Sequence, residues 1–160
     1  MVQGSVRGRV MGVDFGRARI GIAISDELRM LARPLCVIRW SGKEPPIESV
    51  TELMQRHEIC EVLVGLPRNM DGSEGPSSEQ SRRFAAALAL SSRVSVRLID
   101  ERLSTREAYR MIQSTPKGSK PGTQSRTRTG MDAHAAAIIL QRYLDGESVV
   151  PLAPAGTHEE

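Results

Sequence analysis

The order of the apolar segments along the chain limits the folds that it can adopt. Three short strand-like segments come first, and helical and strand-like segments alternate after them. Strands joined by tight turns pair antiparallel, whereas strands joined through a helix pair parallel. The sequence therefore predicts an α/β fold in which a mixed sheet begins with three antiparallel strands, continues with parallel strands and is flanked by helices.

The expected elements follow from residue periodicity and from helix-capping signals. Strands are expected at residues 9–15, 20–25, 35–40, 61–66 and 94–99, and helices at residues 47–54, 79–90, 104–113 and 131–144. In the second strand large isoleucines alternate with Gly21, Ala23 and Ser25, so another element should pack closely on the small face. The length of 160 residues suits one domain, expected at residues 1–150, with a frayed tail at residues 151–160.

Charge is distributed unevenly although the formal net charge is only +3. Between Arg102 and Arg128 there are seven basic residues and one acid, and residues 113–128 carry no large apolar side chain. Such a segment is either a solvated connection or a functional loop that contacts phosphates. With one Trp, two Tyr and two Phe in the chain, we expect nucleic acid to be bound through its shape and phosphates rather than mainly by base stacking.

Other sequence features limit the location of the protein. The first residues lack the apolar core of a signal peptide, and no apolar run is long enough to cross a bilayer, so a cytoplasmic protein without membrane contact is expected. Cys36 and Cys60 lie in apolar strand-like segments, which favours reduced core thiols over a disulfide or a metal site.

Acidic side chains occur at three places where burial or a helix end makes them candidates for catalysis or metal binding. Asp14 follows an apolar strand, where a buried charge is costly unless a positive group meets it. Asp100 and Glu101 end another strand and point to opposite faces, and alternation alone leaves both open. Asp132 lies in the first turn of the last helix, where the helix dipole stabilises a carboxylate.

Each acid also has an ordinary structural explanation. Asp14 would suit a turn before Gly16, the pair at the end of the strand would suit surface salt bridges, and Asp132 is a common type of helix start. Together, however, the acids can converge in one small domain. Clusters of carboxylate oxygens select hard cations such as Mg²⁺ or Mn²⁺, which assist phosphodiester hydrolysis by stabilising the attacking and leaving oxygens.

Four motifs in order resemble the YqgF/RuvX family, a ribonuclease H-like group related to Holliday junction resolvases. They are GVDFGRARIGIAISD, VGLPRNMDGSEGP, DERLST and GMDAHAAAIILQRYLD, and they span residues 12–145. The resemblance implies catalytic metal ligands at Asp14, Glu101 and Asp132, and so favours Glu101 over Asp100, which becomes a supporting residue.

The resemblance also implies residues that border the substrate. The expected substrate-binding residues are Arg17, Arg19, Gly65, Pro67, Asn69, Arg102, Ser104, Thr105, Arg126 and Arg128. Ser104 equally suits a helix cap. The chain departs from the family at Ala18, where a lysine is frequent, so Arg17 or Arg19 would have to compensate. His134 is excluded from the catalytic set, because a histidine on an alanine-rich helix is more often packed or exposed.

Four functions fit these features. The resemblance favours a nuclease that matures the 5′ end of pre-16S ribosomal RNA. The alternative is a resolvase of four-way DNA junctions, which would act as a two-fold homodimer. A non-catalytic RNA-binding factor is a third hypothesis. The segment DFGRARIGIAIS is also similar to the phosphate-binding hairpin of actin-like kinases, but these need two such domains and the chain has room for one.

Overall fold

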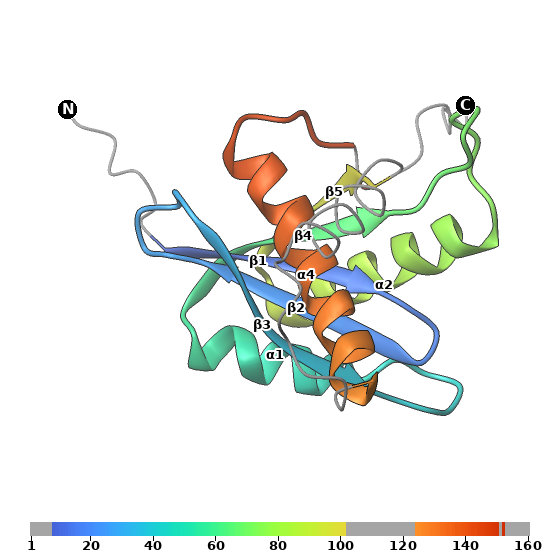
Figure 1. Ribbon diagram of the computed structural model, residues 1–160, viewed down its shortest axis with the longest axis horizontal. Helices are drawn as coiled ribbons and strands as arrows, with labels where there is room; N and C mark the ends of the chain where they lie inside the picture. The colour runs from blue at the N-terminus through green and yellow to red at the C-terminus, as the bar shows by residue number, and fades with distance from the viewer. Residues whose placement is uncertain (1–7, 102–123, 151, 153–160) are drawn as a thin grey trace.

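A mixed five-stranded sheet forms the centre of the molecule, as the computed structural model shows (Figure 1). The structure describes residues 8–101, 124–150 and 152, except for the side chains of residues 124–132. The strands are β1 (Arg9–Phe15), β2 (Arg19–Ser25), β3 (Ala32–Arg39), β4 (Ile59–Leu66) and β5 (Ser95–Asp100). The helices are α1 (Ile47–Arg56), α2 (Pro76–Ser92) and α4 (Gln124–Leu144).

The strand order is β3-β2-β1-β4-β5. The β1–β2 and β2–β3 pairs are antiparallel, and the β1–β4 and β4–β5 pairs are parallel. The predicted fold class is therefore confirmed. The carboxyl ends of β1, β4 and β5 lie along one edge of the sheet, where side chains from three distant parts of the sequence can meet.

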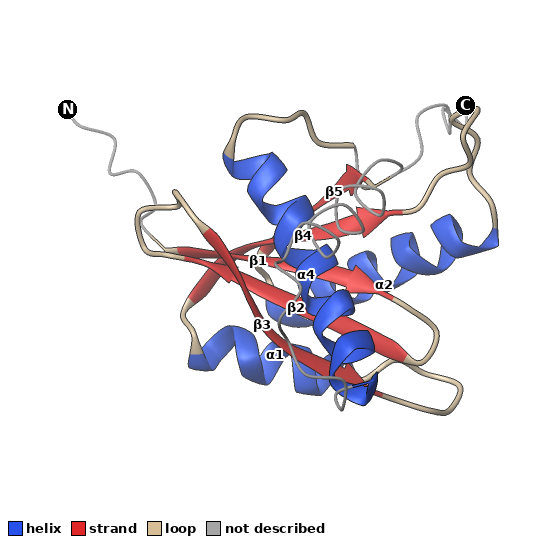
Figure 2. Cartoon of the chain, in the orientation of Figure 1, coloured by secondary structure: helices blue, strands red, loops and turns tan. Residues whose placement is uncertain are grey.

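Helices cover both faces of this sheet (Figure 2). One face packs with α1 and α2 around the buried Phe84 and Leu88, and the other packs with α4 around Leu63 and Leu140. Ala23 belongs to the α4 face, so the prediction of a close neighbour on the small side of β2 is confirmed.

Gly12 on β1 shows how closely α4 approaches the sheet. A Cβ atom at this position would lie 2.8 Å from the carbonyl oxygen of Ala136 and 2.8 Å from the Cβ of Leu140. Such distances leave no space for a side chain, so α4 rests directly on the backbone of β1. This contact places the helix that carries Asp132 over the strand that carries Asp14.

The structure corrects several predicted boundaries. It begins α4 at Gln124 rather than at residue 131, so residues 124–128 of the expected loop are helical. The segment before residue 131 has no large apolar residue, and periodicity therefore could not reveal it. Helix α2 begins at Pro76 rather than at residue 79, with Gly75 as its N-cap. Strand β3 begins at Ala32 rather than at residue 35. Pro34 is compatible with β3 because β3 is an edge strand.

Other sequence predictions have different outcomes. Gly146 has φ +103° just after α4, as expected of a C-terminal glycine. Cys36 and Cys60 are free and half-buried, and burial raises the pKa of the Cys36 thiol. The helix predicted at residues 104–113 and residues 113–123 of the predicted loop lie outside the described residues. The assignment of residues 1–150 to one domain stays a prediction.

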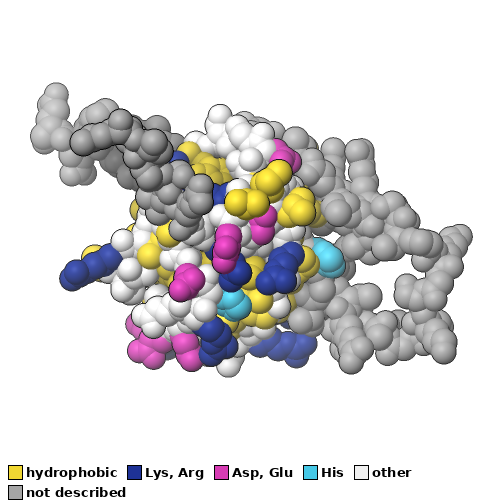
Figure 3. All heavy atoms as spheres, turned by 90° about the vertical axis from the view of Figure 1, so that its left-hand side faces the viewer, with side chains coloured by type: hydrophobic (Ala, Val, Ile, Leu, Met, Phe, Trp, Pro, Cys, Tyr) yellow, Lys and Arg dark blue, Asp and Glu magenta, His cyan; other side chains and the backbone are white. Residues whose placement is uncertain are grey.

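The molecular end that carries the β2–β3 turn lies opposite the carboxyl ends of the parallel strands. Acidic and basic side chains are interspersed there with hydrophobic ones (Figure 3). Leu28, Met30 and Leu31 in this turn are exposed. Within the described part of the chain, no helix combines the length and apolar character that a membrane span requires.

Candidate active site

Asp14 and Glu101 bring two carboxyl groups together at the carboxyl edge of the sheet. Asp14 is the penultimate residue of β1, and Glu101 directly follows β5. The amide of Glu101 donates to the carbonyl oxygen of Leu66 at 3.2 Å, which continues the β4–β5 pairing by one residue. The two side chains are close enough to share a hydrogen bond.

Gly65 on β4 provides the space in which Glu101 crosses between these strands. A Cβ atom at Gly65 would collide with Oε2 of Glu101 and would lie 3.0 Å from Cδ1 of Ile139 on α4. Glu101 therefore extends over β4 on the face that α4 covers. Asp14 shares this face, because it alternates with Val13, which packs on the opposite side.

The electrostatic environment of Glu101 favours a protonated carboxyl group. Burial is the largest cause, followed by the charge of Asp14 and the hydrogen bond with it, and together with the charge of Asp100 they raise the pKa of Glu101 to about 8. The positive charge of Arg142 acts in the opposite direction. Two carboxyl groups this close require a proton or a cation between them.

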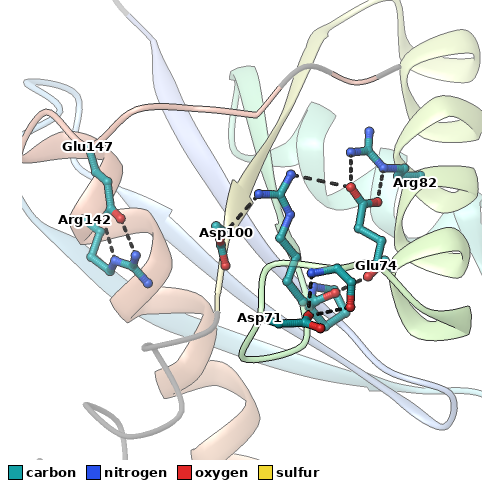
Figure 4. A network of polar contacts seen from close by, with 10 residues as sticks. Asp71, Glu74, Arg82, Asp100, Arg142 and Glu147 are labelled. Atoms are coloured by element: carbon teal, nitrogen blue, oxygen red, sulfur yellow. Dashed lines mark hydrogen bonds and ion pairs between the residues drawn. The ribbon is translucent and has the colours of Figure 1, made fainter. Parts of the chain in front are cut away.

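Asp100 occupies a different environment on the other face of β5. Its Oδ2 lies 3.6 Å from a guanidinium nitrogen of Arg68, and the same guanidinium lies 3.5 Å from Glu74. Glu74 in turn pairs with Arg82 at 2.6 Å, and Figure 4 shows Asp100 connected to Glu74 through this network. The hydrogen bond from Arg82 is the main cause that lowers the pKa of Glu74. Asp100 therefore forms an ion pair with Arg68, whereas Glu101 faces Asp14.

The loop after β4 is held at the same edge of the sheet. The hydroxyl of Ser78 donates to the carbonyl oxygen of Pro67, and the amide of Asn69 donates to the carbonyl oxygen of Ser73 at 2.9 Å. Ser73 also donates through its backbone and its hydroxyl to Asp71. These contacts order a turn in which Asn69 is exposed, next to the strand that passes beneath Glu101.

The position of Asp132 is known from the backbone of α4. Residues 132, 136 and 139 share one face of this helix because they are four and seven residues apart. Ala136 and Ile139 on that face pack against the sheet. The side chain of Asp132 lies outside the described residues, and among the side chains that are described no three His, Cys, Asp or Glu groups gather as a metal site.

The carboxyl pair nevertheless fits a divalent cation. Its donors are oxygens, which Mg²⁺ and Mn²⁺ prefer. Burial and the neighbouring charge of Asp14 raise the pKa of Glu101, and a bound cation would offset both effects. Asp14 and Glu101 would hold such an ion.

The other predicted site residues are partly placed. Arg17 is exposed in the β1–β2 turn, and Arg19 is half-buried at the start of β2. Ala18 is also exposed in that turn, and His134 is exposed on α4. Three expected substrate-binding residues lie outside the described residues, and two more lie in α4 with undescribed side chains. The first three are Arg102, Ser104 and Thr105, and the other two are Arg126 and Arg128.

Sequence reasoning missed two cations of the site, Arg68 and Arg142. Arg142 pairs with Glu147 (Figure 4). Its positive charge also acts to lower the pKa of Glu101. Arg142 lies three residues after Ile139, and this spacing indicates a shared helix face. The sequence held no signal that this face lies beside Glu101, or that Arg68 pairs with Asp100.

These observations define a class of protein. The strand order, the helices on both faces and the acids at the ends of β1 and β5 are those of a ribonuclease H-like fold. Solved structures agree on the fold. Fowlpox virus resolvase with Holliday junction DNA matches with a TM-score of 0.54 and 13% identity over 86% of this chain and 97% of that one. RuvC of Thermus thermophilus matches with a TM-score of 0.51 and 18% identity over 85% of this chain and 93% of that one.

The chain belongs to the RuvX family, whose model is described as Holliday junction resolvase and matches residues 8–146. Similar curated relatives bear the name "Putative pre-16S rRNA nuclease". One from Anaeromyxobacter sp. (strain Fw109-5) is 45% identical over 86% of this chain and 97% of its own length. Another from Myxococcus xanthus (strain DK1622) is 41% identical over 86% of this chain and 87% of its own length. The expected family is confirmed, and the chain is a nuclease by class.

Proposed function

We propose that this chain is a divalent-cation-dependent endonuclease that processes the 5′ end of pre-16S ribosomal RNA. The observation that carries the proposal is the meeting of the Asp14 and Glu101 carboxyl groups at the carboxyl edge of the sheet. Curated relatives at 45% and 41% identity carry the matching name. Action on precursor ribosomal RNA would take place in the cytoplasm.

Asp14, Glu101 and Asp132 are the proposed ligands of Mg²⁺ or Mn²⁺. When bound, the cations would activate a water molecule and stabilise the leaving oxygen of the phosphodiester. Asp14 and Glu101 would release their shared proton and hold the ions on the α4 face. Gly65 leaves the space that Glu101 needs, and α4 would bring Asp132 to the same face.

The remaining predicted residues would bind the substrate. Pro67 and Asn69 lie in a loop whose hydrogen bonds hold it beside Glu101, and Arg17 and Arg19 flank the turn after Asp14. These positions border the edge of the sheet on which the carboxyl groups lie. We assign Arg102, Ser104, Thr105, Arg126 and Arg128 to phosphate contacts, as the family resemblance implies.

Resolution of four-way DNA junctions is the second candidate. The description of the RuvX family model favours it, and it would require a two-fold homodimer to cut symmetric strands. The solved resolvases are less than 20% identical to the chain, so their likeness concerns the fold. The names of the more similar relatives therefore favour RNA as the substrate.

A cleavage assay tests both candidates. Purified protein is incubated with Mg²⁺ or Mn²⁺ on a 16S precursor transcript with a 5′ extension and on a four-way DNA junction. We expect cleavage of the transcript near its mature 5′ end, and a loss of about a hundredfold or more in Asp14→Asn and Glu101→Gln because ligand groups are removed. Glu52→Gln, on the exposed side of α1, is the control and should keep full activity.

Three outcomes distinguish the alternatives. Cleavage that survives both substitutions would indicate a contaminant and overturn the assignment of the site. Cleavage of the junction alone would favour the resolvase. Tight RNA binding without cleavage by the wild-type protein would favour a non-catalytic RNA-binding factor.

A further inference from the structure

A concave surface lies at the same edge of the sheet as the carboxyl pair, on the α1 and α2 side. It is a cavity of about 540 Å³ between the β1–β2 turn, the segment after β3 and α2. Its volume is in the range of small-molecule sites. The residues that line it include Phe15, Arg17, Trp40, Lys43, Arg83 and Phe84.

Three of the five aromatic residues of the chain gather at this cavity. The ring of Phe15 stacks on Phe84 with centroids 4.5 Å apart, and Trp40 stacks on Phe15 with centroids 5.9 Å apart. Phe84 is buried in the core, whereas Trp40 is half-buried at the margin. The rings therefore form a continuous stack from the core to the cavity.

The indole of Trp40 is fixed in place by the turn that follows Asp14. Its Nε1 donates to the carbonyl oxygen of Gly16 at 3.0 Å, and its backbone amide donates to the carbonyl oxygen of Ala18 at 3.0 Å. An aromatic ring held in this way loses little conformational entropy when another ring stacks on it. The stack is a preorganised surface for a planar ligand.

Cations surround the stack, and among the described residues that line the cavity none is acidic. Arg17 comes from the β1–β2 turn, Lys43 from the segment after β3 and Arg83 from α2, and all three are exposed. Arg83 also pairs with Glu79 at 2.6 Å on the same helix. Positive groups around an aromatic platform match a nucleotide, which combines a planar base with phosphates.

The cavity is connected to the carboxyl pair by the β1–β2 turn. Phe15 follows Asp14 directly, and alternation directs their side chains to opposite faces of the sheet. A strand that contacts both must pass over the end of β1, where Arg17 is exposed. A single strand can bend in this way, whereas a duplex is stiff.

From this arrangement we infer that the cavity holds an unpaired nucleotide of the substrate strand, with its base on the Trp40–Phe15 stack and its phosphates near Arg17, Lys43 and Arg83. The inference rests on the proposed nuclease function, because the bound nucleotide belongs to the strand that reaches Asp14. The small number of aromatic residues led us to expect that base stacking would not be the main mode of binding. The inference modifies this expectation, because three aromatic residues suffice for a stacking surface when the fold brings them together. Stacking on a ring is tolerant of sequence, so recognition stays non-specific.

Trp40 is the only tryptophan of the chain, so its fluorescence reports on the cavity directly. The full chain is titrated in EDTA with a single-stranded RNA of about ten nucleotides, within the usual site size for such surfaces. We expect the RNA to quench Trp40. An abasic strand of equal length, which retains the phosphates, and a duplex of the same sequence should cause little quenching. Equal quenching by the abasic strand, or RNA binding by anisotropy without quenching, would overturn the inference.

Substitutions test the cations with a matched control. Arg83→Ala and Arg56→Ala each remove an exposed arginine that pairs with a glutamate one helical turn earlier, but only Arg83 lines the cavity. We expect Arg83→Ala and Lys43→Ala to weaken RNA binding by about threefold to tenfold and Arg56→Ala to leave it unchanged. Trp40→Leu should weaken it by about tenfold or more. Equal effects in Arg83→Ala and Arg56→Ala would contradict the inference.

The cleavage assay separates this inference from the proposed function. If the chain cleaves its substrate while Trp40 does not respond to RNA, the cavity assignment fails and the nuclease assignment stands. If RNA quenches Trp40 and the abasic strand does not, while no substrate is cut, the nuclease assignment fails instead.

Discussion

Asp14 and Glu101 share a hydrogen bond although 86 residues separate them in the sequence. They meet because β1 and β5 run parallel with β4 between them, and because Glu101 crosses over Gly65. The pair lies at the carboxyl edge of the sheet, where ligands of open α/β sheets commonly bind. Its proton has consequences for stability, for cation binding and for the residues that surround it.

The stability of the cation-free protein should depend on Glu101 in a defined pH window. Its pKa is about 8 in the folded chain against an ordinary 4.5, so the folded state binds more protons than the unfolded state between these values. The stabilising contribution of Glu101 to the free energy of unfolding is therefore present at acid pH, and it is lost as the pH rises through this window. Thermal unfolding in EDTA should show the wild type losing stability relative to Glu101→Gln as the pH rises from 4.5 to 8. A constant difference between the two proteins would contradict the shift.

Binding of Mg²⁺ should release the shared proton. Below the pKa of Glu101 the cation must displace this proton, so the apparent affinity should rise by about tenfold per pH unit and level off near pH 8. Calorimetry in buffers of different ionisation enthalpy measures the proton released. Asp14→Asn should abolish the binding, and Glu52→Gln should preserve it. An affinity that does not change with pH would show that Glu101 is not a ligand.

Gly65→Ala should impair the site through steric overlap. The new methyl group would occupy the place of Oε2 of Glu101 and press on Ile139. We expect a loss of about tenfold or more in cleavage and about 1–3 kcal/mol in the free energy of unfolding. Gly75→Ala is the matched control, because a Cβ atom there would meet no atom of the described residues within 4 Å. Equal activity of the two variants would show that Glu101 can adopt another position.

Glu61→Ala should destabilise the fold without changing the chemistry. Glu61 is buried on β4, where it accepts a hydrogen bond from Arg29 at 3.1 Å and from the hydroxyl of Tyr143 at 2.5 Å. Its removal leaves a partly buried guanidinium without this partner, at a cost of about 3 kcal/mol, whereas Tyr143→Phe should cost about 1.5 kcal/mol. Urea denaturation measures both values. A milder effect of Glu61→Ala than of Tyr143→Phe would contradict the network.

Much of the fold was readable from the sequence because local patterns determine it. The apolar run at residues 9–15 predicted β1 with its observed bounds, and the small residues of β2 predicted the close approach of α4. The family motifs pointed to Asp14 and Glu101. Periodicity failed where its signal was absent, as at the start of α4, where the residues are polar.

The sequence by itself determined the strands, their parallel or antiparallel pairing and the candidate acids, because alternation and helical spacing are properties of neighbouring residues. Only the tertiary structure decided that Glu101, and not Asp100, lies on the face of Asp14, and that Arg68 pairs with Asp100. It also decided that Phe15, Trp40 and Phe84 form one stack. These contacts join residues far apart in the chain, and their geometry depends on how strands and helices pack, which local sequence patterns do not encode.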